Sequence, residues 1–232
     1  MKATVYYGPY DIRIEDKPRP QIKDPNDLIL KVTTTAICGS DLHFYHGPMK
    51  MPPGLIPGHE FMGIVEETGP DVHEVKKGDR VVIPFSISCG QCWFCRHQLW
   101  SKCDRSAGAV YGFPGYDGGQ AEYVLVKYGN VDPLKIPDSL TDEQVIFLSD
   151  ILCTGYYGAD IANVQPGDDV AVFGAGPVGY FVVMSSFLRG AGRVFSIDRI
   201  PARLKKTAEL GAETINFEEK DPVKTILDAT GG

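Results

Sequence analysis

Four cysteines in a short stretch constrain the fold of this chain more than any other feature. Cys89, Cys92, Cys95 and Cys103 are separated by two, two and seven intervening residues. Four thiolates this close in sequence can surround one tetrahedral zinc ion and leave no position open for a substrate. Two disulfides or four unrelated thiols are the alternatives, and a nucleic-acid zinc module would need more basic neighbours. The spacing favours a structural zinc that fixes a loop-like insert, Ser86 to Gly119.

The composition argues against several classes of protein. The 232 residues carry a formal charge of −7, which argues against nucleic acid as a partner because phosphate binding needs clustered lysine and arginine. Residues 1–20 contain no apolar signal segment, and no stretch approaches the roughly 20 apolar residues that span a bilayer. We therefore expect a cytoplasmic protein without a membrane partner, in which the clustered cysteines bind metal.

The first part of the chain is predicted to be rich in β-structure. Short runs of β-branched and aromatic residues are separated by turns that contain Gly, Pro and Asp. Such spacing is typical of a closed or folded-over antiparallel sheet. A helix is expected at Asp142–Ser149, with Thr141 as its cap. The predicted strands are Thr4–Tyr7, Leu28–Ala36, Gly63–Thr68, Arg80–Pro84 and Ala121–Val126.

From Asp169 onward the predicted strands and helices alternate. This pattern implies a parallel sheet with right-handed crossovers. The expected fold is therefore mixed α and β, with an antiparallel β domain over residues 1–150 and part of a doubly wound parallel domain over residues 151–232. The predicted strands are Val170–Phe173, Arg193–Ile197 and Thr214–Phe217, and the predicted helices are Pro177–Arg189, Ala202–Leu210 and Asp221–Ala229.

A glycine motif, Gly174-x-Gly176-x2-Gly179, directly follows the predicted strand Val170–Phe173 and opens a helix with Pro177 near its first position. The pattern alone is weak, but this strand-turn-helix context is what a dinucleotide-binding fingerprint requires. The glycines allow a tight turn and a close approach of the backbone to a pyrophosphate, which the helix N-terminus attracts. A glycine-rich turn in some other α/β domain is the alternative.

Asp198 is expected to select between NAD and NADP. It stands at the end of the next predicted strand, 19 residues beyond Gly179. A carboxylate there would accept hydrogen bonds from a ribose 2′-hydroxyl and repel a 2′-phosphate, which favours NAD. Arg199, the next residue, blurs that preference because its charge would attract a phosphate.

A second set of metal-binding residue types is spread along the chain. Cys38 follows the strand predicted at Leu28–Ala36, and His59 and Glu60 precede the strand predicted at Gly63–Thr68. A thiolate, an imidazole and a carboxylate form the kind of mixed ligand set with which a catalytic zinc keeps one position open. Each residue also has a simpler explanation, Cys38 as a buried apolar filler and His59 as a core histidine. The spacing alone does not decide between these interpretations.

These elements, in this order, resemble the medium-chain zinc-dependent alcohol dehydrogenase family over essentially the whole chain. The segment His59-Glu60-x2-Gly63-x5-Gly69-x2-Val72 matches the family's zinc signature at each fixed position. The resemblance implies a GroES-like antiparallel domain followed by a Rossmann domain, two zinc ions per chain and NAD as the cofactor. It makes Cys38 and His59 ligands of a catalytic zinc. The residues that it assigns to cofactor binding are Thr154, Gly174, Gly176, Pro177, Val178, Gly179, Asp198 and Arg199.

The resemblance places the third ligand of the catalytic zinc at Asp150. An aspartate here, with Ser149 before it and a Thr154-Gly155 turn after it, is similar to the glutathione-independent formaldehyde dehydrogenase branch. Cys153 offers a competing thiolate, which we interpret as buried filler.

The resemblance also implies a mechanism. Zinc would act as a Lewis acid on the alcohol, Ser40 would take the hydroxyl proton, and His43 would pass it outward. A hydride would then move from the substrate carbon to the nicotinamide. Glu60 would be an outer carboxylate or a transient zinc ligand. From the residues alone, Ser40 is equally a turn or cap serine, and His43 equally a surface histidine.

The C-terminal part departs most from the family. A Rossmann domain of this class has six parallel strands, and the residues up to Gly232 supply three predicted ones. We expect either a fragment of a longer protein or a truncated product, and a 232-residue polypeptide that keeps zinc but shows little NAD-linked oxidation. A zinc-stabilised, non-catalytic protein is the alternative. The expected substrates are formaldehyde and small primary alcohols, then polyols or threonine, and the full-length form is expected to be a homodimer or homotetramer.

Overall fold

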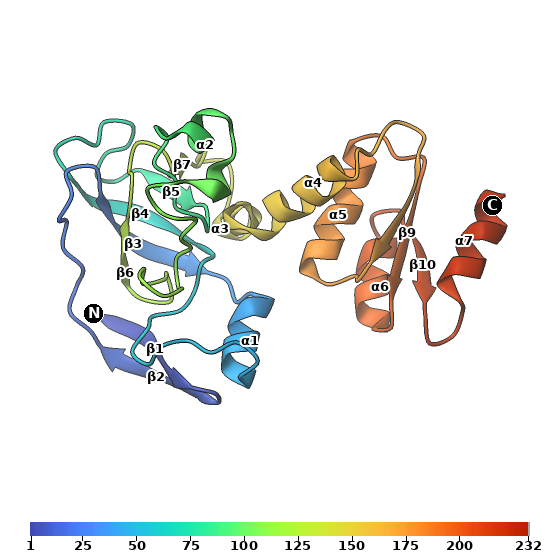
Figure 1. Ribbon diagram of the computed structural model, residues 1–232, viewed down its shortest axis with the longest axis horizontal. Coiled ribbons are helices and arrows are strands. Elements are labelled where there is room, and N and C mark those ends of the chain that lie inside the picture. Colours follow the sequence, from blue (N-terminus) through green and yellow to red (C-terminus); the bar gives the residue numbers. More distant parts are fainter. Residues whose placement is uncertain (232) are drawn as a thin grey trace. The chain divides into compact units, whose positions relative to one another are not determined.

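The computed structural model describes residues 1–231, which form two compact units, Met1–Asp150 and the part from Ile151 onward. Figure 1 shows that the first unit is built mainly from strands and the second from alternating helices and strands. Within the described residues, no helix is long and apolar enough to cross a membrane.

The first unit contains a five-stranded antiparallel sheet with the strand order β6-β3-β4-β5-β7. Leu28, Phe61, Val81 and Val126 from four of these strands are fully buried in one shared core. An isolated bridge joins Ala3, in the N-terminal antiparallel hairpin, to Ala121, two residues before β6. The predicted antiparallel β architecture is confirmed. The strands are β1 Lys2–Gly8, β2 Asp11–Asp16, β3 Leu28–Thr35, β4 Phe61–Thr68, β5 Arg80–Ile83, β6 Tyr123–Val126 and β7 Leu134–Lys135.

Several elements of the first unit were not predicted, among them β2, α1 and the short strand β7. Strand β2 was not predicted because it lacks a buried face; Ile12 and Ile14 are both exposed. Helix α1, Gly39–His46, was not predicted because its start depends on a capping contact rather than on an apolar pattern. Cys38 is its N-cap residue, and the Asp41 carboxylate accepts the backbone N–H of Cys38 at 2.9 Å.

The segment from Ser86 to Gly119 is mostly loop, as predicted, and contains the short helix α2, Trp93–Arg96, and the 3-10 turn η1, Trp100–Lys102. The helix predicted near Asp142 is split into α3, Asp142–Val145, and the 3-10 turn η2, Ile146–Ser149. Thr141 and Gln144 form a capping box at its start, which confirms the predicted cap.

The second unit has a parallel sheet, as predicted, and its strand order is β10-β9-β8. In Figure 1, α5 and α6 lie on one face of this sheet and α7 on the other. Val194 of β9 packs on the α5 face, whereas Phe195 and Ile197 pack with Ile226 of α7. The elements are α4 Ile151–Ile161, β8 Asp169–Phe173, α5 Pro177–Leu188, β9 Arg193–Asp198, α6 Pro201–Ala208, β10 Glu213–Asn216 and α7 Pro222–Thr230.

Helix α4 corrects two expectations. Thr154 and Gly155, which were predicted to form a turn, lie within the helix. A side chain at Gly155 would collide with Phe181 of α5, so the glycine allows the two helices to pack closely. Cys153 is exposed rather than buried. The buried positions of α4 are Ile151, Gly155 and Ala159, so Cys153 lies on a different face of the helix.

A buried ion pair joins Asp27, the residue before β3, to Lys127, the residue after β6, and its loss is expected to destabilise the first unit strongly. Asp27 is 1% exposed, and its carboxylate receives the Lys127 ammonium at 2.5 Å. Lys127→Met would leave this carboxylate buried and unpaired, which costs about 3–5 kcal/mol. The matched control is Lys2→Met, which removes an exposed pair with Asp16 and should cost less than about 1 kcal/mol. Urea unfolding measures both changes.

The loss of unfolding free energy caused by Lys127→Met should also depend on pH. Burial raises the pKa of Asp27, so in the folded variant the carboxyl binds a proton more tightly than in the unfolded chain. Stability therefore falls as the pH rises above the unfolded pKa, and the variant should lose less stability near pH 5 than near pH 8. Equal losses in Lys127→Met and Lys2→Met would contradict the buried-pair interpretation.

Candidate metal and dinucleotide sites

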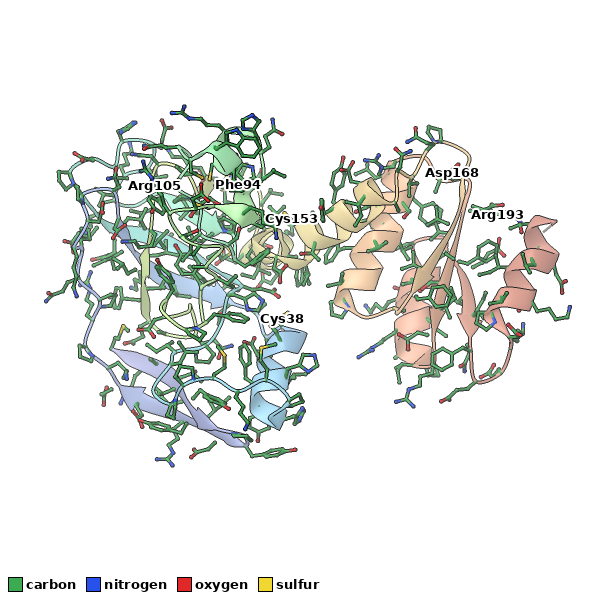
Figure 2. All side chains as sticks on the ribbon, in the orientation of Figure 1. Cys38, Phe94, Arg105, Cys153, Asp168 and Arg193 are labelled. Carbon is green, nitrogen blue, oxygen red and sulfur yellow. The ribbon has the colours of Figure 1, made fainter. Side chains whose placement is uncertain are left out.

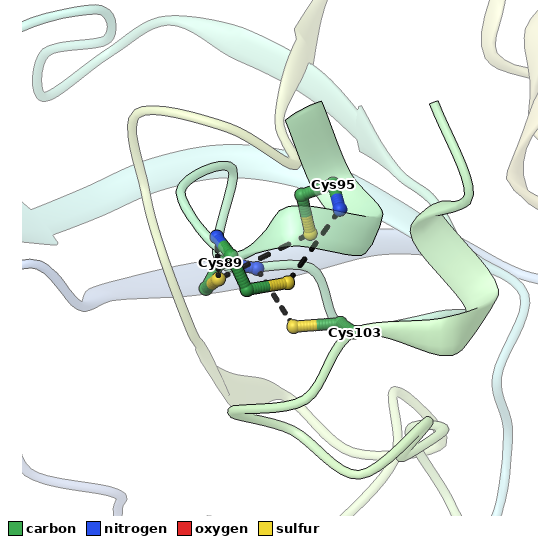
Figure 3. A group of neighbouring side chains, drawn as sticks. Cys89, Cys95 and Cys103 are labelled. Carbon is green, nitrogen blue, oxygen red and sulfur yellow. Dashed lines mark hydrogen bonds between the residues drawn. The ribbon is translucent and has the colours of Figure 1, made fainter. Parts of the chain in front are cut away.

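The four clustered cysteines converge in the folded chain. Their sulfur atoms all lie within 4.8 Å of one another, and the Sγ atoms of Cys89 and Cys95 are 4.0 Å apart (Figure 3). Two thiolates at about 2.3 Å from one tetrahedral zinc would be about 3.8 Å apart, whereas a disulfide needs about 2.05 Å. The arrangement therefore fits one metal ion and does not fit two disulfides.

Backbone N–H groups point at these sulfur atoms. Cys89 N donates to the Sγ of Cys103 at 3.4 Å, and Cys92 N donates to the Sγ of Cys89 at 3.3 Å. Burial opposes ionisation of Cys103, but hydrogen bonds from Ser106 and Cys89 outweigh it and lower the pKa of this thiol. Such donors stabilise thiolates and orient them, as a closed metal site requires.

A second donor group forms where three segments of the first unit meet. Cys38, His59, Glu60 and Asp150 each bring one ligand atom, and these atoms lie within 4.8 Å of one another. Cys38 caps α1 (Figure 2), His59 and Glu60 directly precede β4, and Asp150 follows η2. His59 Nε2 is 3.2 Å from Asp150 Oδ2 and 4.0 Å from Glu60 Oε1.

The electrostatics of this second group fit a divalent cation. Burial lowers the pKa of His59, but its hydrogen bonds with Asp150 and Cys38 outweigh burial and raise the pKa to about 10. Burial and the nearby Asp150 carboxylate raise the pKa of Glu60. The shift of His59 indicates an excess of negative charge around the imidazole. A zinc ion bound by sulfur, nitrogen and oxygen would balance that charge.

The surroundings of His59 exclude water. His59 is 4% exposed, and its ring lies edge-on to Phe85 and Phe113, with ring centroids 6.3 and 6.1 Å away. Asp41, which sequence reasoning did not single out, is also buried close by. The signal that could have identified it is an acid three residues after the N-cap Cys38.

Ser40 and His43 both lie on α1, three residues apart and therefore on one side of the helix. The Ser40 hydroxyl is buried and, among the described residues, has no hydrogen-bond partner. His43 is exposed near the end of the helix. A buried hydroxyl that the protein leaves unsatisfied is available to a bound molecule.

The glycine motif of the second unit forms the turn between β8 and α5. Gly174 has a φ of +94°, Gly176 is the N-cap of α5, and Pro177 occupies its first turn. A Cβ on Gly179 would lie 1.7 Å from the carbonyl oxygen of Gly174, so this turn requires glycine there. Val178 is 38% exposed at the start of the same helix.

Asp198 braces this turn. Its carboxylate accepts the backbone N–H of Ala175 at 2.8 Å and that of Arg199 at 2.7 Å. Burial opposes ionisation, but hydrogen bonds from the backbone N–H groups of Ile200, Ala175 and Arg199 outweigh it and lower the pKa of Asp198. The Arg199 side chain pairs with Glu218 at 3.6 Å, and Thr154 lies in the first half of α4.

Comparison with known proteins agrees with this architecture. Residues 24–138 match the model of the alcohol dehydrogenase GroES-like domain. Such a domain, followed by a parallel unit of alternating strands and helices, defines the class of the zinc-type dehydrogenases.

Individual relatives identify the family. The chain is 45% identical over 240 residues to the uncharacterized zinc-type alcohol dehydrogenase-like protein AdhB of Bacillus subtilis, a match that covers 98% of this chain and 64% of that protein. It is 39% identical to the glutathione-independent formaldehyde dehydrogenase of Pseudomonas aeruginosa, over 100% of this chain and 62% of the relative. The solved alcohol dehydrogenase TADH from Thermus sp. ATN1 has a TM-score of 0.95 and 41% identity, over 100% of this chain and 67% of that one. This chain belongs to the medium-chain zinc-type alcohol dehydrogenase family.

Proposed function

We propose that this chain carries the zinc centre and the first half of the NAD site of a dehydrogenase that oxidises a small alcohol or a hydrated aldehyde such as formaldehyde. The observation that carries the proposal is the convergence of Cys38, His59 and Asp150, with Glu60 beside them, within 4.8 Å. These four residue types suit a zinc site with an open position, in contrast to the closed four-thiolate site. The formaldehyde dehydrogenase relative supports the substrate class.

In this proposal Cys38, His59 and Asp150 hold the zinc ion, and Glu60 lies at hand as an outer carboxylate. When bound, zinc would supply Lewis-acid polarisation of the substrate oxygen. Ser40 would accept the hydroxyl proton at its buried, unsatisfied Oγ, and His43 would carry the proton to solvent from the exposed side of α1. Phe85 and Phe113 would keep water from the reacting atoms.

For the cofactor, we propose that Gly174, Gly176 and Gly179 with the N-terminus of α5 bind the pyrophosphate of NAD. Asp198 would accept hydrogen bonds from the adenosine ribose, and its charge would disfavour a 2′-phosphate. The pairing of Arg199 with Glu218 directs that cation to a carboxylate, whereas the Arg203 guanidinium lies 3.9 Å from Asp198 Oδ2. The proposed preference for NAD over NADP therefore rests on the Asp198 carboxylate. Thr154, Pro177 and Val178 would contribute to the same binding region.

Two glycine substitutions should distinguish the role of the turn in stability from its role in pyrophosphate binding. Gly179→Ala places a methyl group 1.7 Å from a backbone oxygen and should cost about 1–3 kcal/mol of stability. Gly176→Ala meets nothing closer than the Arg203 guanidinium at 3.9 Å, so the fold should persist. A methyl group there blocks close approach of a phosphate, and ADP binding should weaken by about tenfold or more. Thermal unfolding and ADP calorimetry measure both; unchanged ADP affinity in Gly176→Ala would contradict the proposed site.

Turnover tests the proposed reaction in the protein as the cell makes it. NAD reduction should accompany oxidation of formaldehyde or ethanol, and Ser40→Ala should lower kcat by about 10²- to 10⁴-fold while metal content stays constant. Threonine and a polyol serve as the competing substrates. A protein that binds zinc and ADP but oxidises none of these compounds would support the non-catalytic alternative instead.

A further inference from the structure

We propose that Asp142 and Arg80 form a clamp that positions Asp150, so that both are positioning residues for the metal site; this inference rests on the proposed function. Asp150 does not belong to the sheet. It lies at the end of the segment formed by α3 and η2, and its location depends on how that segment is fastened to the strands.

The Asp142 carboxylate makes three hydrogen bonds to two strands. The hydroxyls of Thr33 and Thr34 on β3 donate to Oδ2 at 2.7 and 3.0 Å, and the Arg80 guanidinium at the start of β5 donates to Oδ1 at 2.9 Å. Arg80 also donates to the carbonyl oxygens of Pro137 and Leu140. The side chains of Asp142 and Arg80 are only 24% and 23% exposed, so solvent screens this pair less than a surface pair.

The rest of the segment is held along its length. Val145 and Ile146 pack on Met62 of β4 and Val82 of β5. At the far end, the carbonyl oxygen of Ser149 accepts the N–H of Phe85 at 2.9 Å, one residue before Asp150. The clamp at Asp142 and this hydrogen bond therefore fix the two ends of the segment that carries the carboxylate ligand.

The clamp also connects the segments that carry the other ligands. β3, which bears Thr33 and Thr34, continues directly toward Cys38. Ala36 N donates to the Glu60 carbonyl oxygen at 3.0 Å, which ties this strand to the residue after His59. A carboxylate displaced by about 1 Å would no longer fit the geometry that zinc requires, so loosening the clamp should weaken metal binding.

The test measures the zinc affinity of the mixed site by competition with a chelator, and its geometry from the visible spectrum of the cobalt-substituted protein. Arg80→Met should weaken zinc binding at that site by about tenfold and alter the cobalt spectrum, while the four-thiolate site keeps its affinity. Arg80→Lys should recover part of the loss, because lysine can pair with Asp142 but cannot also reach both carbonyl oxygens. The double variant Thr33→Val with Thr34→Val removes the other half of the clamp and should act in the same direction.

Lys135→Met is the matched control, since it removes the ion pair between an exposed lysine and Asp79, the residue before Arg80, and should change neither site. Wild-type affinity and spectrum in both Arg80→Met and the threonine double variant would overturn the clamp while leaving the metal site intact. No metal at the mixed site of the wild-type protein would overturn the proposed function and the clamp together.

Discussion

Cys95→Ser is expected to remove one zinc ion per chain and to unfold the lobe formed by residues 86–119. Cys95 is 1% exposed, and the buried members of its local cluster are themselves cysteines. The part of the lobe around the cysteines therefore has little apolar core to replace the metal, whereas Ile87 and Tyr111 at its base belong to the core of the sheet. Structural zinc contributes about 10–16 kcal/mol to the folding of small peptides, so loss of a ligand outweighs other single changes in this region. Elemental analysis and limited proteolysis followed by mass spectrometry measure the effect.

Cys153→Ser is the matched control for this substitution. Cys153 is an exposed cysteine of α4 and belongs to neither donor group. The control should keep both zinc ions and the wild-type proteolysis pattern. If Cys95→Ser keeps the same zinc content and the same resistance to proteolysis, the four cysteines do not form the structural site.

His59→Ala is expected to remove the other zinc ion and to lower turnover by about 10³-fold or more, while the lobe of residues 86–119 stays folded. The substitution removes the only imidazole of the mixed group and leaves Cys38, Glu60 and Asp150. Only two of the three proposed zinc ligands then remain, and the cavity left by the imidazole ring keeps them from closing around the ion. Elemental analysis with a turnover assay of the protein as the cell makes it measures both effects.

His43→Ala distinguishes the loss of a proton carrier from the loss of a metal ligand. His43 is exposed on α1 and lies outside both donor groups, so its loss should leave two zinc ions bound. Turnover should fall less than in His59→Ala, because water can replace a surface proton carrier. A His59→Ala variant with full turnover would remove the mixed site from the proposed mechanism.

The features that could be predicted from the sequence are those whose cause is local. The glycine turn was predictable because Gly174 and Gly179 are close in sequence and meet one steric demand. Thr141 was recognisable as a cap because its partner Gln144 is three residues away. The four-cysteine site was predictable for the same reason. In each of these motifs, the residues that interact are close in sequence.

The rest depends on contacts between distant segments. Asp150 and His59 are 91 positions apart, so only the family resemblance predicted that they lie in one site. The exposure of Cys153 follows from the way α4 packs through Gly155, which no local pattern shows. From the sequence alone, Asp142 is an ordinary acidic residue in the first turn of a predicted helix. Its partners Thr33, Thr34 and Arg80 lie far away along the chain, so no local pattern shows the contact.

The central claim is that one chain holds two different metal sites, one closed and structural and one mixed and open. The most direct test is the zinc content of the wild-type protein, His59→Ala and Cys95→Ser, each purified without added metal. We expect about two zinc ions per chain in the wild type and about one in each variant. A wild-type protein with a single zinc ion that survives His59→Ala would contradict the account.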